Sequence, residues 1–357
     1  MTGVCDVDLL RATPANSPVP RSTSQITGGS PTPVCWVVTE GAIGMENQAL
    51  GLAEAIGLPT VIKRVMVRAP WTNLPAQLWP RPLSLIAEGS DRLDGPWPRL
   101  LITCGRRSVP FSMAIRHASG GGCFTVHVQD PKVRLSNFDL VVPPRHDGLS
   151  GPNVVASRGA LNRVTPQKLA EGVRRLVPQI AALPHPVVAV LLGGTSNGFR
   201  LTPARTSRLA DQLLELVQST GAGLAVTPSR RTGEENIAEL RRKLSGSGVF
   251  LWDGTGPNPY FGLLGLADAI AVTCDSVSMV SEAATTGKPT YVIDLDGGSR
   301  RFRRFHDSLH ADGVTRPFDG GLEQWVYAPL DDTTTVAAAV RQRLGLAAQE
   351  PTECHWT

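Results

Sequence analysis

Short apolar runs alternate with amphipathic segments along most of the chain. Residues 34–39 form an apolar run between a proline and a glycine, a pattern typical of a buried parallel strand. Residues 45–56 then place apolar side chains at helical spacing, and a Gly-Leu-Pro sequence ends this helix. The alternation predicts an open α/β sheet. The other elements expected in the first half are strands at 61–67, 100–103, 123–128 and 138–142, and a helix near 110–118.

The second half repeats this alternation. A helix is expected to begin after the N-cap Thr165, and two prolines around His185 mark a linker. We therefore predict an α/β fold with two Rossmann-like, doubly wound domains and a cleft between them: 34–184 and 185–357, after a disordered tail 1–33. The last helix of the second domain could pack back on the first. The further expected elements are strands at 187–192, 224–227, 249–252, 269–273 and 290–293, helices at 203–218, 234–244, 260–266 and 277–285, and a basic segment at 299–310.

The composition fits a globular chain that binds a small anionic molecule. Of its 357 residues 41% are hydrophobic and 18% are charged, which suits buried cores rather than disorder. The formal net charge is +4, and most of the positive residues are arginines, which make forked contacts with phosphate. Aromatic residues make up only 5% and are not interleaved with basic runs, so we expect no nucleic-acid binding.

The spacing of the cysteines and the hydropathy of the chain indicate the cellular compartment. The six cysteines are scattered, without a C-x-x-C pair or a zinc-like spacing, so we expect neither disulfides nor a structural metal. Residues 1–33 lack the apolar stretch of a signal peptide, and no later run reaches the roughly 18 apolar residues of a membrane span. These patterns predict a cytoplasmic protein, with peripheral contact to the inner face of a membrane left open.

Residues 69–98 interrupt the α/β pattern with six prolines and three tryptophans. This composition predicts an excursion from the sheet. The tryptophans either pack back onto the domain, which we favour, or form an exposed patch for an acceptor or a membrane surface.

Two constellations in the second half suit a phosphorylated ligand. Gly193, Gly194 and Thr195 begin a Gly-rich loop between a strand and a helix, where backbone N–H groups and the helix dipole can bind phosphate. A tight turn explains these glycines almost as well. In the segment after strand 269–273, Ser276 and Ser278 could donate to phosphate. Glu282, one to two turns into the next helix, could accept both ribose hydroxyls.

A third segment, Ser229 and Arg230, follows another strand end, where Arg230 could clamp phosphate or the segment could simply cap the next helix. In the first half, the loops at the carboxyl ends of the strands carry the candidates for a general base and for acceptor recognition. The candidate bases are Glu46, Asp130 and His146, with Glu40 and Asp147 as further carboxylates, and the other cleft residues are Gly41, Gly44, Asn47, Gln48, Arg106 and Arg107.

Taken together, these loops resemble the bacterial branch of the elongated-mitochondria family, from about Trp36 to Gly320. That family in turn is similar to the GT-B glycosyltransferase fold, which implies diphosphate contacts at Gly193–Thr195, a ribose contact at Glu282 and a donor contact at Tyr260. Related peptidoglycan glycosyltransferases carry a histidine in the first Gly-rich loop, where this chain has Glu46 and Asn47. The motifs that carry the resemblance are Gly41/Gly44/Asn47/Gln48, 105–107, 129–131, 138–139, 146–147, 193–194, 229–230, 258–260 and 278–289.

The sequence leaves three functions to compare. The first is a metal-independent glycosyltransferase that uses a nucleotide-sugar as substrate, without a further cofactor, and a cell-envelope lipid or glycan as acceptor. The second, a nucleotide-sugar epimerase, lacks support because the first loop has no G-x-G-x-x-G and no tyrosine has a lysine four residues later. The third is a non-catalytic scaffold that binds a membrane or protein partners through basic residues such as Arg300, Arg301, Arg303 and Arg304.

Overall fold

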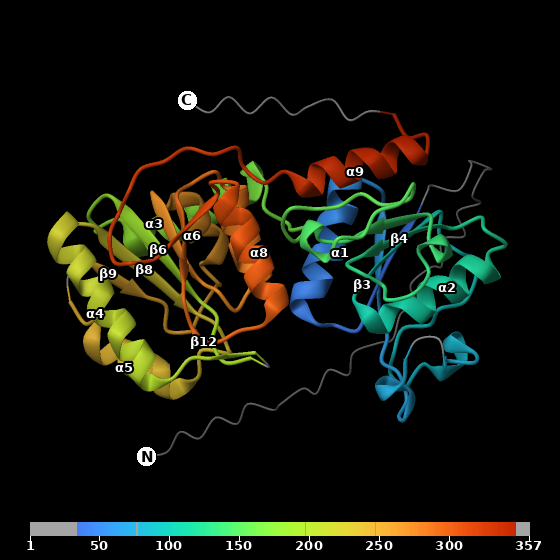
Figure 1. The fold of residues 1–357 in the computed structure, drawn as a ribbon, viewed down its shortest axis with the longest axis horizontal. Coiled ribbons are helices and arrows are strands. Elements are labelled where there is room, and N and C mark those ends of the chain that lie inside the picture. Colours follow the sequence, from blue (N-terminus) through green and yellow to red (C-terminus); the bar gives the residue numbers. More distant parts are fainter. Residues whose placement is uncertain (1–33, 76–77, 197, 247, 348–357) are drawn as a thin grey trace, which may run out of the picture. The chain divides into compact units, whose positions relative to one another are not determined.

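Two separate parallel sheets organise the residues that the computed structural model describes, namely 34–75, 78–196, 198–246 and 248–347 (Figure 1). The predicted tail 1–33 lies outside these residues. The described residues from 34 onward all belong to one compact unit, so both sheets and the space between them can be described together.

The first sheet has the strand order β2-β1-β3-β4-β5, with every pair parallel. This is a doubly wound order, whose direction of winding reverses between β1 and β3. The elements are β1 (Cys35–Thr39), α1 (Ile43–Ile56), β2 (Thr60–Arg64), η1 (Trp71–Asn73), η3 (Pro82–Leu85), β3 (Leu100–Cys104), η4 (Arg106–Ser108), α2 (Val109–Ala118), β4 (Phe124–Val128), η5 (Leu135–Asn137), β5 (Leu140–Val142) and η6 (Arg145–Asp147).

The second sheet has the order β13-β11-β10-β6-β8-β9, again all parallel, with its reversal between β6 and β10. The prediction of two doubly wound Rossmann-like sheets is confirmed. The elements are α3 (Pro166–Ile180), β6 (Val187–Leu192), β7 (Phe199–Arg200), α4 (Pro203–Thr220), β8 (Gly223–Pro228), α5 (Glu234–Lys243), β9 (Val249–Leu251), α6 (Tyr260–Leu266), β10 (Ala269–Thr273), α7 (Val277–Thr285), β11 (Thr290–Ile293), β12 (Asp296–Gly297), α8 (Arg300–Ala311), β13 (Thr315–Pro317) and α9 (Asp332–Arg343).

Both faces of each sheet are covered, which explains why the strands are continuous apolar runs. In β6, alternate side chains enter different cores: Val187, Ala189 and Leu191 pack with α3, α6, α7 and α8, whereas Val188 and Val190 pack with α4 and α5. Figure 1 shows the corresponding helices on the two sides of this sheet. The period-2 geometry of a strand therefore supplies both cores from one short sequence.

The chain returns to the first sheet at its last helix. α9 packs against α1, and its Val336, Ala337 and Val340 are buried in the same core as Leu52 (Figure 1). The segment before α3 is also tied to later elements, because the N–H of Ala160 donates to Ser281 Oγ at 2.8 Å. Contacts between residues that are far apart in the sequence thus join the parts of the chain that form the two sheets.

The Pro- and Trp-rich excursion folds onto the first sheet. Trp79 is 6% exposed and packs edge-on against Phe111 with ring centroids 5.8 Å apart, and Trp97 meets Trp36 in a similar way. The favoured interpretation, that the tryptophans pack back, agrees with this arrangement. Exposed apolar side chains remain there at Met66 and Leu78. The expected strand 61–67 was too long, since residues after Arg64 leave the sheet to enter the excursion.

Candidate functional site

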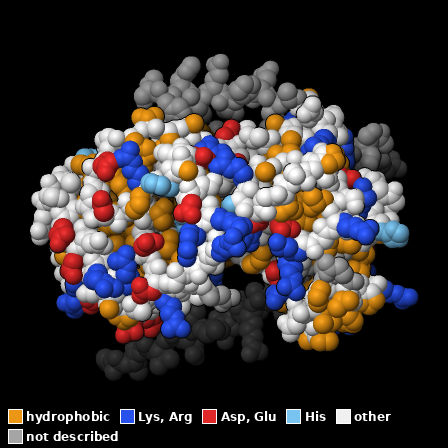
Figure 2. Space-filling model, in the orientation of Figure 1, with side chains coloured by type: hydrophobic (Ala, Val, Ile, Leu, Met, Phe, Trp, Pro, Cys, Tyr) orange, Lys and Arg blue, Asp and Glu red, His pale blue; other side chains and the backbone are white. Residues whose placement is uncertain are grey.

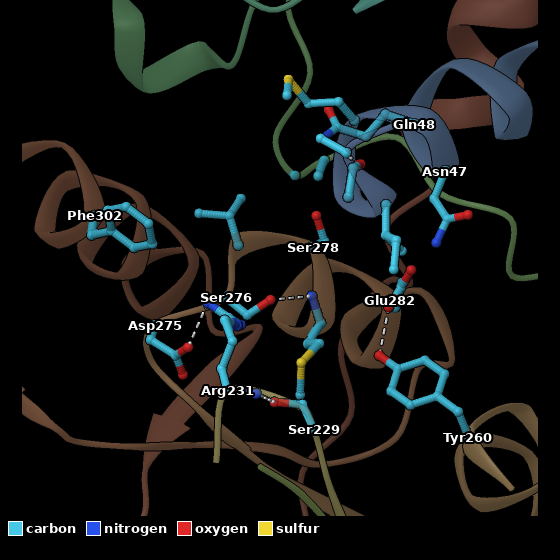
Figure 3. Close-up of a pocket in the computed structure, with 18 of the residues that line it drawn as sticks. Asn47, Gln48, Ser229, Arg231, Tyr260, Asp275, Ser276, Ser278, Glu282 and Phe302 are labelled. Atoms are coloured by element: carbon cyan, nitrogen blue, oxygen red, sulfur yellow. Dashed lines mark hydrogen bonds and ion pairs between the residues drawn. The ribbon is translucent and has the colours of Figure 1, made fainter. Parts of the chain in front are cut away.

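A cavity of about 950 Å³ lies at the carboxyl ends of both sheets. Residues after β1, β4 and β5 line it from the first sheet, and residues after β8, β9 and β10 line it from the second. Open parallel sheets bind ligands at this edge, next to the point where the strand order reverses. Figure 3 shows side chains from α1, α6, α7 and α8 pointing toward this common space.

The N-termini of two helices meet at the cavity. Ser276 caps α7, with its Oγ accepting from the N–H of Met279 at 3.3 Å, and Ala42 begins α1 without a side-chain cap. A Cβ added at Gly44 in α1 would lie 3.6 Å from Ser278 Oγ in α7, so the two first turns are in near contact. The first N–H groups of a helix have no acceptor within it and carry partial positive charge. The meeting point therefore attracts anions.

Asp275, the residue before the N-cap of α7, has a fully buried side chain that the sequence did not single out. Its Oδ2 accepts from the N–H of Gly194 at 3.1 Å and pairs with Arg231 Nη1 at 2.9 Å. Its Oδ1 has no hydrogen-bond partner among the described residues and lies over Gly193, where a Cβ would come within 2.2 Å of it. Arg231, half-exposed, thus lines the cavity beside α7 with its guanidinium fixed by a buried carboxylate (Figure 3).

The Gly-rich loop lies behind this pair. The N–H of Gly193 donates to Thr273 Oγ1 at 2.7 Å, and the N–H of Thr195 donates to the carbonyl of Arg231 at 3.1 Å. Neither residue, nor Gly194 between them, lines the cavity, whereas Ser229 and Arg230 do. Ser229 Oγ donates to the carbonyl of Gly193 at 2.9 Å, so it also holds the loop in place. That the Gly-rich loop, Ser229 and Arg230 contact a nucleotide-sugar stays a prediction.

Glu282 is 7% exposed and lines the cavity from the second turn of α7. Its Oε2 accepts from the hydroxyl of Tyr260 at 2.5 Å (Figure 3). Burial raises the pKa of Glu282 to about 7, against the lowering effect of the Tyr260 hydrogen bond, and burial also raises the pKa of Tyr260 well above its usual value. Trp252 and Phe261 line the same cavity and offer flat apolar surfaces. A carboxylate fixed at one oxygen in this way can accept hydroxyl donors at the other.

The structure separates the three candidate bases. Glu46 is held by Arg64 through two hydrogen bonds of 2.7 and 3.1 Å, and Asp130 binds the N–H of Lys132 at 2.8 Å; neither lines the cavity. His146 does line it. Burial lowers the pKa of His146 below its ordinary value, so the imidazole is neutral at pH 7 and able to accept a proton.

The other predicted cleft residues are also divided. Gly44, Asn47 and Gln48 line the cavity, and Gln48 Nε2 donates to the carbonyl of Gly44 at 3.2 Å. Gly41, Arg106 and Arg107 lie outside its lining. Arg107 instead pairs with Glu40 at 2.8 Å beside a separate cavity of about 330 Å³.

The described residues contain neither a candidate metal centre nor a candidate membrane span. Within residues 34–347, apart from the gaps given above, no three His, Cys, Asp or Glu side chains gather in a way that could hold a metal ion. No helix in that part of the chain is long and apolar enough to cross a membrane.

Comparison with known proteins identifies the family. The family model described as mitochondrial fission ELM1 matches residues 43–344. The mitochondrial fission protein ELM1 of Arabidopsis thaliana is 32% identical over 278 residues, which cover 70% of this chain and 64% of the plant protein. The uncharacterized protein RP120 of Rickettsia prowazekii is 24% identical over 348 residues, covering 86% of this chain and 97% of that protein.

A solved structure shares the fold. It is the UDP-GlcNAc 2-epimerase of Methanocaldococcus jannaschii in complex with UDP-GlcNAc and UDP, with a TM-score of 0.51, 10% identity, and coverage of 87% of this chain and 99% of that one. At this identity the likeness shows the fold alone, a GT-B-like pair of Rossmann-like sheets. With a family model that spans most of its length, the chain belongs to the mitochondrial fission ELM1 family.

Proposed function

We propose that the protein binds a nucleotide-sugar in this cavity and transfers the sugar to an acceptor. The observation that carries the proposal is the arrangement around α7: Ser276 and Ser278 at its N-terminus, Arg231 beside it, and Glu282 in its second turn. A nucleoside diphosphate has a matching order of groups, with a diphosphate followed by a ribose diol. The fold neighbour named as an epimerase is described in complex with UDP-GlcNAc and UDP, which supports this ligand class.

In this proposal the N-terminus of α7 and the arginines Arg230 and Arg231 hold the diphosphate, and Glu282 accepts the ribose hydroxyls. The base would lie against the aromatic walls at Trp252 and Phe261. As the bond between the sugar C1 and the diphosphate breaks, negative charge collects on the leaving diphosphate. Fixed positive charge and helix N–H groups stabilise that charge without a metal ion.

His146 is the candidate base for the acceptor. Of the three predicted bases only His146 lines the cavity, and its lowered pKa keeps it neutral. It would take the proton of the acceptor hydroxyl as the oxygen of that hydroxyl forms its bond to C1. The acceptor is proposed to be a cell-envelope lipid or glycan.

An epimerase of the same fold is the competing enzyme. The motifs missing from the sequence exclude only epimerases that use a dinucleotide cofactor. The solved fold neighbour is itself named as an epimerase, so the shared fold is compatible with this activity. Incubation with UDP-GlcNAc separates the two enzymes, because an epimerase changes the sugar without any acceptor, whereas a transferase requires one.

A non-catalytic scaffold is the other alternative. Figure 2 shows hydrophobic side chains gathered over the excursion that follows β2, where Met66 and Leu78 are 57% and 58% exposed. Arg300 and Arg303 on α8 are exposed as well. These features would suit a membrane surface or a protein partner, and we place the protein in the cytoplasm with peripheral contact to the inner face of a membrane.

A thermal-shift screen tests the proposal. The protein is heated with UDP, GDP, ADP or CMP, and a ligand at about one hundred times its dissociation constant adds about 2.7 kcal/mol to the free energy of unfolding. We expect one nucleoside diphosphate to stabilise the wild type and not Glu282→Ala. Glu215→Ala removes an exposed carboxylate on α4 and should behave as the wild type. If no nucleotide stabilises the wild type, the scaffold is the better function.

A further inference from the structure

The single turn η6, which carries His146, is held by α8 through the residues on both of its sides. Arg145 Nη2 donates to Ser308 Oγ at 2.6 Å and to Asp312 Oδ2 at 2.7 Å. On the other side, Arg301 donates to both oxygens of Asp147 at 3.1 and 2.8 Å. η6 follows β5 of the first sheet, and α8 lies between β11 and β13 of the second sheet, so an element of one sheet's surroundings positions a cavity residue beside the other.

The side chain of His146 itself also packs against α8. Its ring meets Phe305 edge-on, with the ring centroids 5.7 Å apart, and Phe305 is fully buried. The His146 side chain is only 6% exposed, and its Nε2 lies 3.9 Å from Asp147 Oδ1. Any change in the partners of Asp147 therefore changes the electrostatic potential at the imidazole.

Arg301 contacts this turn and also lines the cavity. It lines the cavity together with Arg231 and Ser276, and 55% of its side chain is exposed. A guanidinium has five N–H donors, and Asp147 is bound through the Nε and one terminal nitrogen. An anion in the cavity can use the remaining donors, or draw the guanidinium away from Asp147.

We propose that Arg301 is a positioning residue: it couples the binding of a diphosphate in the cavity to the electrostatic environment of the His146 imidazole. This inference rests on the proposed function for the identity of the anion. While Arg301 is paired with Asp147 it neutralises that carboxylate, which is then a weaker hydrogen-bond acceptor for the imidazole. When the diphosphate engages Arg301, Asp147 is released to accept a hydrogen bond from the protonated His146. His146 therefore becomes a stronger base only when the nucleotide-sugar is bound.

The charges around the imidazole determine the direction of the effect. Burial lowers the pKa of His146, Asp147 raises it, and Arg301, Arg304 and His306 on α8 lower it. Loss of the Arg301 charge removes one of the contributions that lower the pKa of His146. It also leaves Asp147, which raises this pKa, without its neutralising partner. The pKa of His146 must therefore rise when Arg301 is removed or engaged by an anion.

The test is an NMR titration of the His146 ring in the full-length protein. We expect Arg301→Met to raise the pKa of His146 by about 1 without any ligand, a size typical of one nearby charge. Arg303→Met is the matched control, because Arg303 lies on the same helix without forming this contact, and should leave the pKa unchanged. Asp147→Asn should lower it. Circular dichroism of each variant shows that it folds, and Arg301→Lys should restore part of the wild-type value.

Inorganic pyrophosphate and UDP are the ligand probes. In the wild type each should raise the pKa of His146, and the rise should be clearly smaller in Arg301→Met and in Asp147→Asn. An unchanged pKa in ligand-free Arg301→Met would overturn the positioning role, even if UDP binds. An equal rise in all variants would overturn the coupling. Lack of UDP binding with a raised pKa in Arg301→Met would instead count against the proposed function alone.

Discussion

The buried carboxyl of Glu282 makes stability depend on pH, and Glu282→Gln is the change that reveals it. Burial raises the pKa of Glu282 from 4.5 to about 7 in the folded protein. Between these values the unfolded chain has already lost the proton and the folded protein has kept it. Folding is then accompanied by proton uptake, so this residue's contribution to stability falls as the pH rises from 4.5 and is fully lost above 7.

The size of the effect follows from the same shift. One pKa unit corresponds to about 1.4 kcal/mol, so a displacement from 4.5 to about 7 amounts to about 3 kcal/mol. Glutamine has nearly the same shape, can accept from Tyr260 through its carbonyl oxygen, and never ionises. The free energy of unfolding of Glu282→Gln minus that of the wild type should therefore increase by about 3 kcal/mol between pH 4.5 and pH 8.

Thermal and urea unfolding between pH 4.5 and 8.5 measure this difference. A change of about 3 kcal/mol corresponds to roughly 6–12 °C in Tm for a domain of this size. Other titrating groups are common to both proteins and cancel. Glu215→Gln, the same chemical change at an exposed site on α4, should show no comparable dependence. A difference between Glu282→Gln and the wild type that stays constant across the pH range would refute the account of a strongly desolvated carboxyl.

Three further results are expected. Tyr260→Phe removes the hydrogen bond that lowers the pKa of Glu282, so the midpoint of the pH dependence of stability should move to higher pH. An unchanged midpoint would show that this hydrogen bond is weak. Nucleotide affinity measured by calorimetry should rise as the pH passes through 7, because the ionised carboxylate is the better acceptor for ribose hydroxyls, whereas affinity in Glu282→Gln should be flat. Gly51→Ala on α1 should cost roughly 1–3 kcal/mol by urea unfolding, because its Cβ would lie 2.2 Å from the carbonyl oxygen of Asn162, while Gly246→Ala, with open space around it, should be near neutral.

Local pattern was sufficient to predict the strands and helices that position the site. Residues 187–192, 269–273 and 277–285 form β6, β10 and α7 with the expected bounds, since buried strands and capped helices have short-range signatures. The basic segment 299–310 proved to be mostly helix α8, whose arginines obscured a single apolar stripe through Phe305 and Leu309. The sequence singled out Glu282 because a carboxylate among apolar neighbours in a helix is unusual, and the structure places it in the cavity lining; its contact with a ribose stays a prediction.

Other parts of the site could not be predicted from sequence. Asp275 resembles any residue before a helix cap, and its importance arises from Arg231, which reaches it from a different strand end. Arg301 was noted only as part of a basic surface, because its partner Asp147 is 154 residues away. The ion pairs of Glu46 with Arg64 and of Asp130 with Lys132 also left no signal in the sequence. Each case depends on a long-range or lateral contact that leaves no local pattern.

The position of α9 has a consequence for biosynthesis. The core of the first sheet includes Val336, Ala337 and Val340, which leave the ribosome long after Leu52 of the same core. Until then Leu52 and its neighbours on α1 remain uncovered, although their own sheet was made first. The emerging chain therefore carries an apolar surface for most of its synthesis, where chaperones can bind. A premature stop before residue 332 would leave that surface exposed and mark the product for aggregation or degradation.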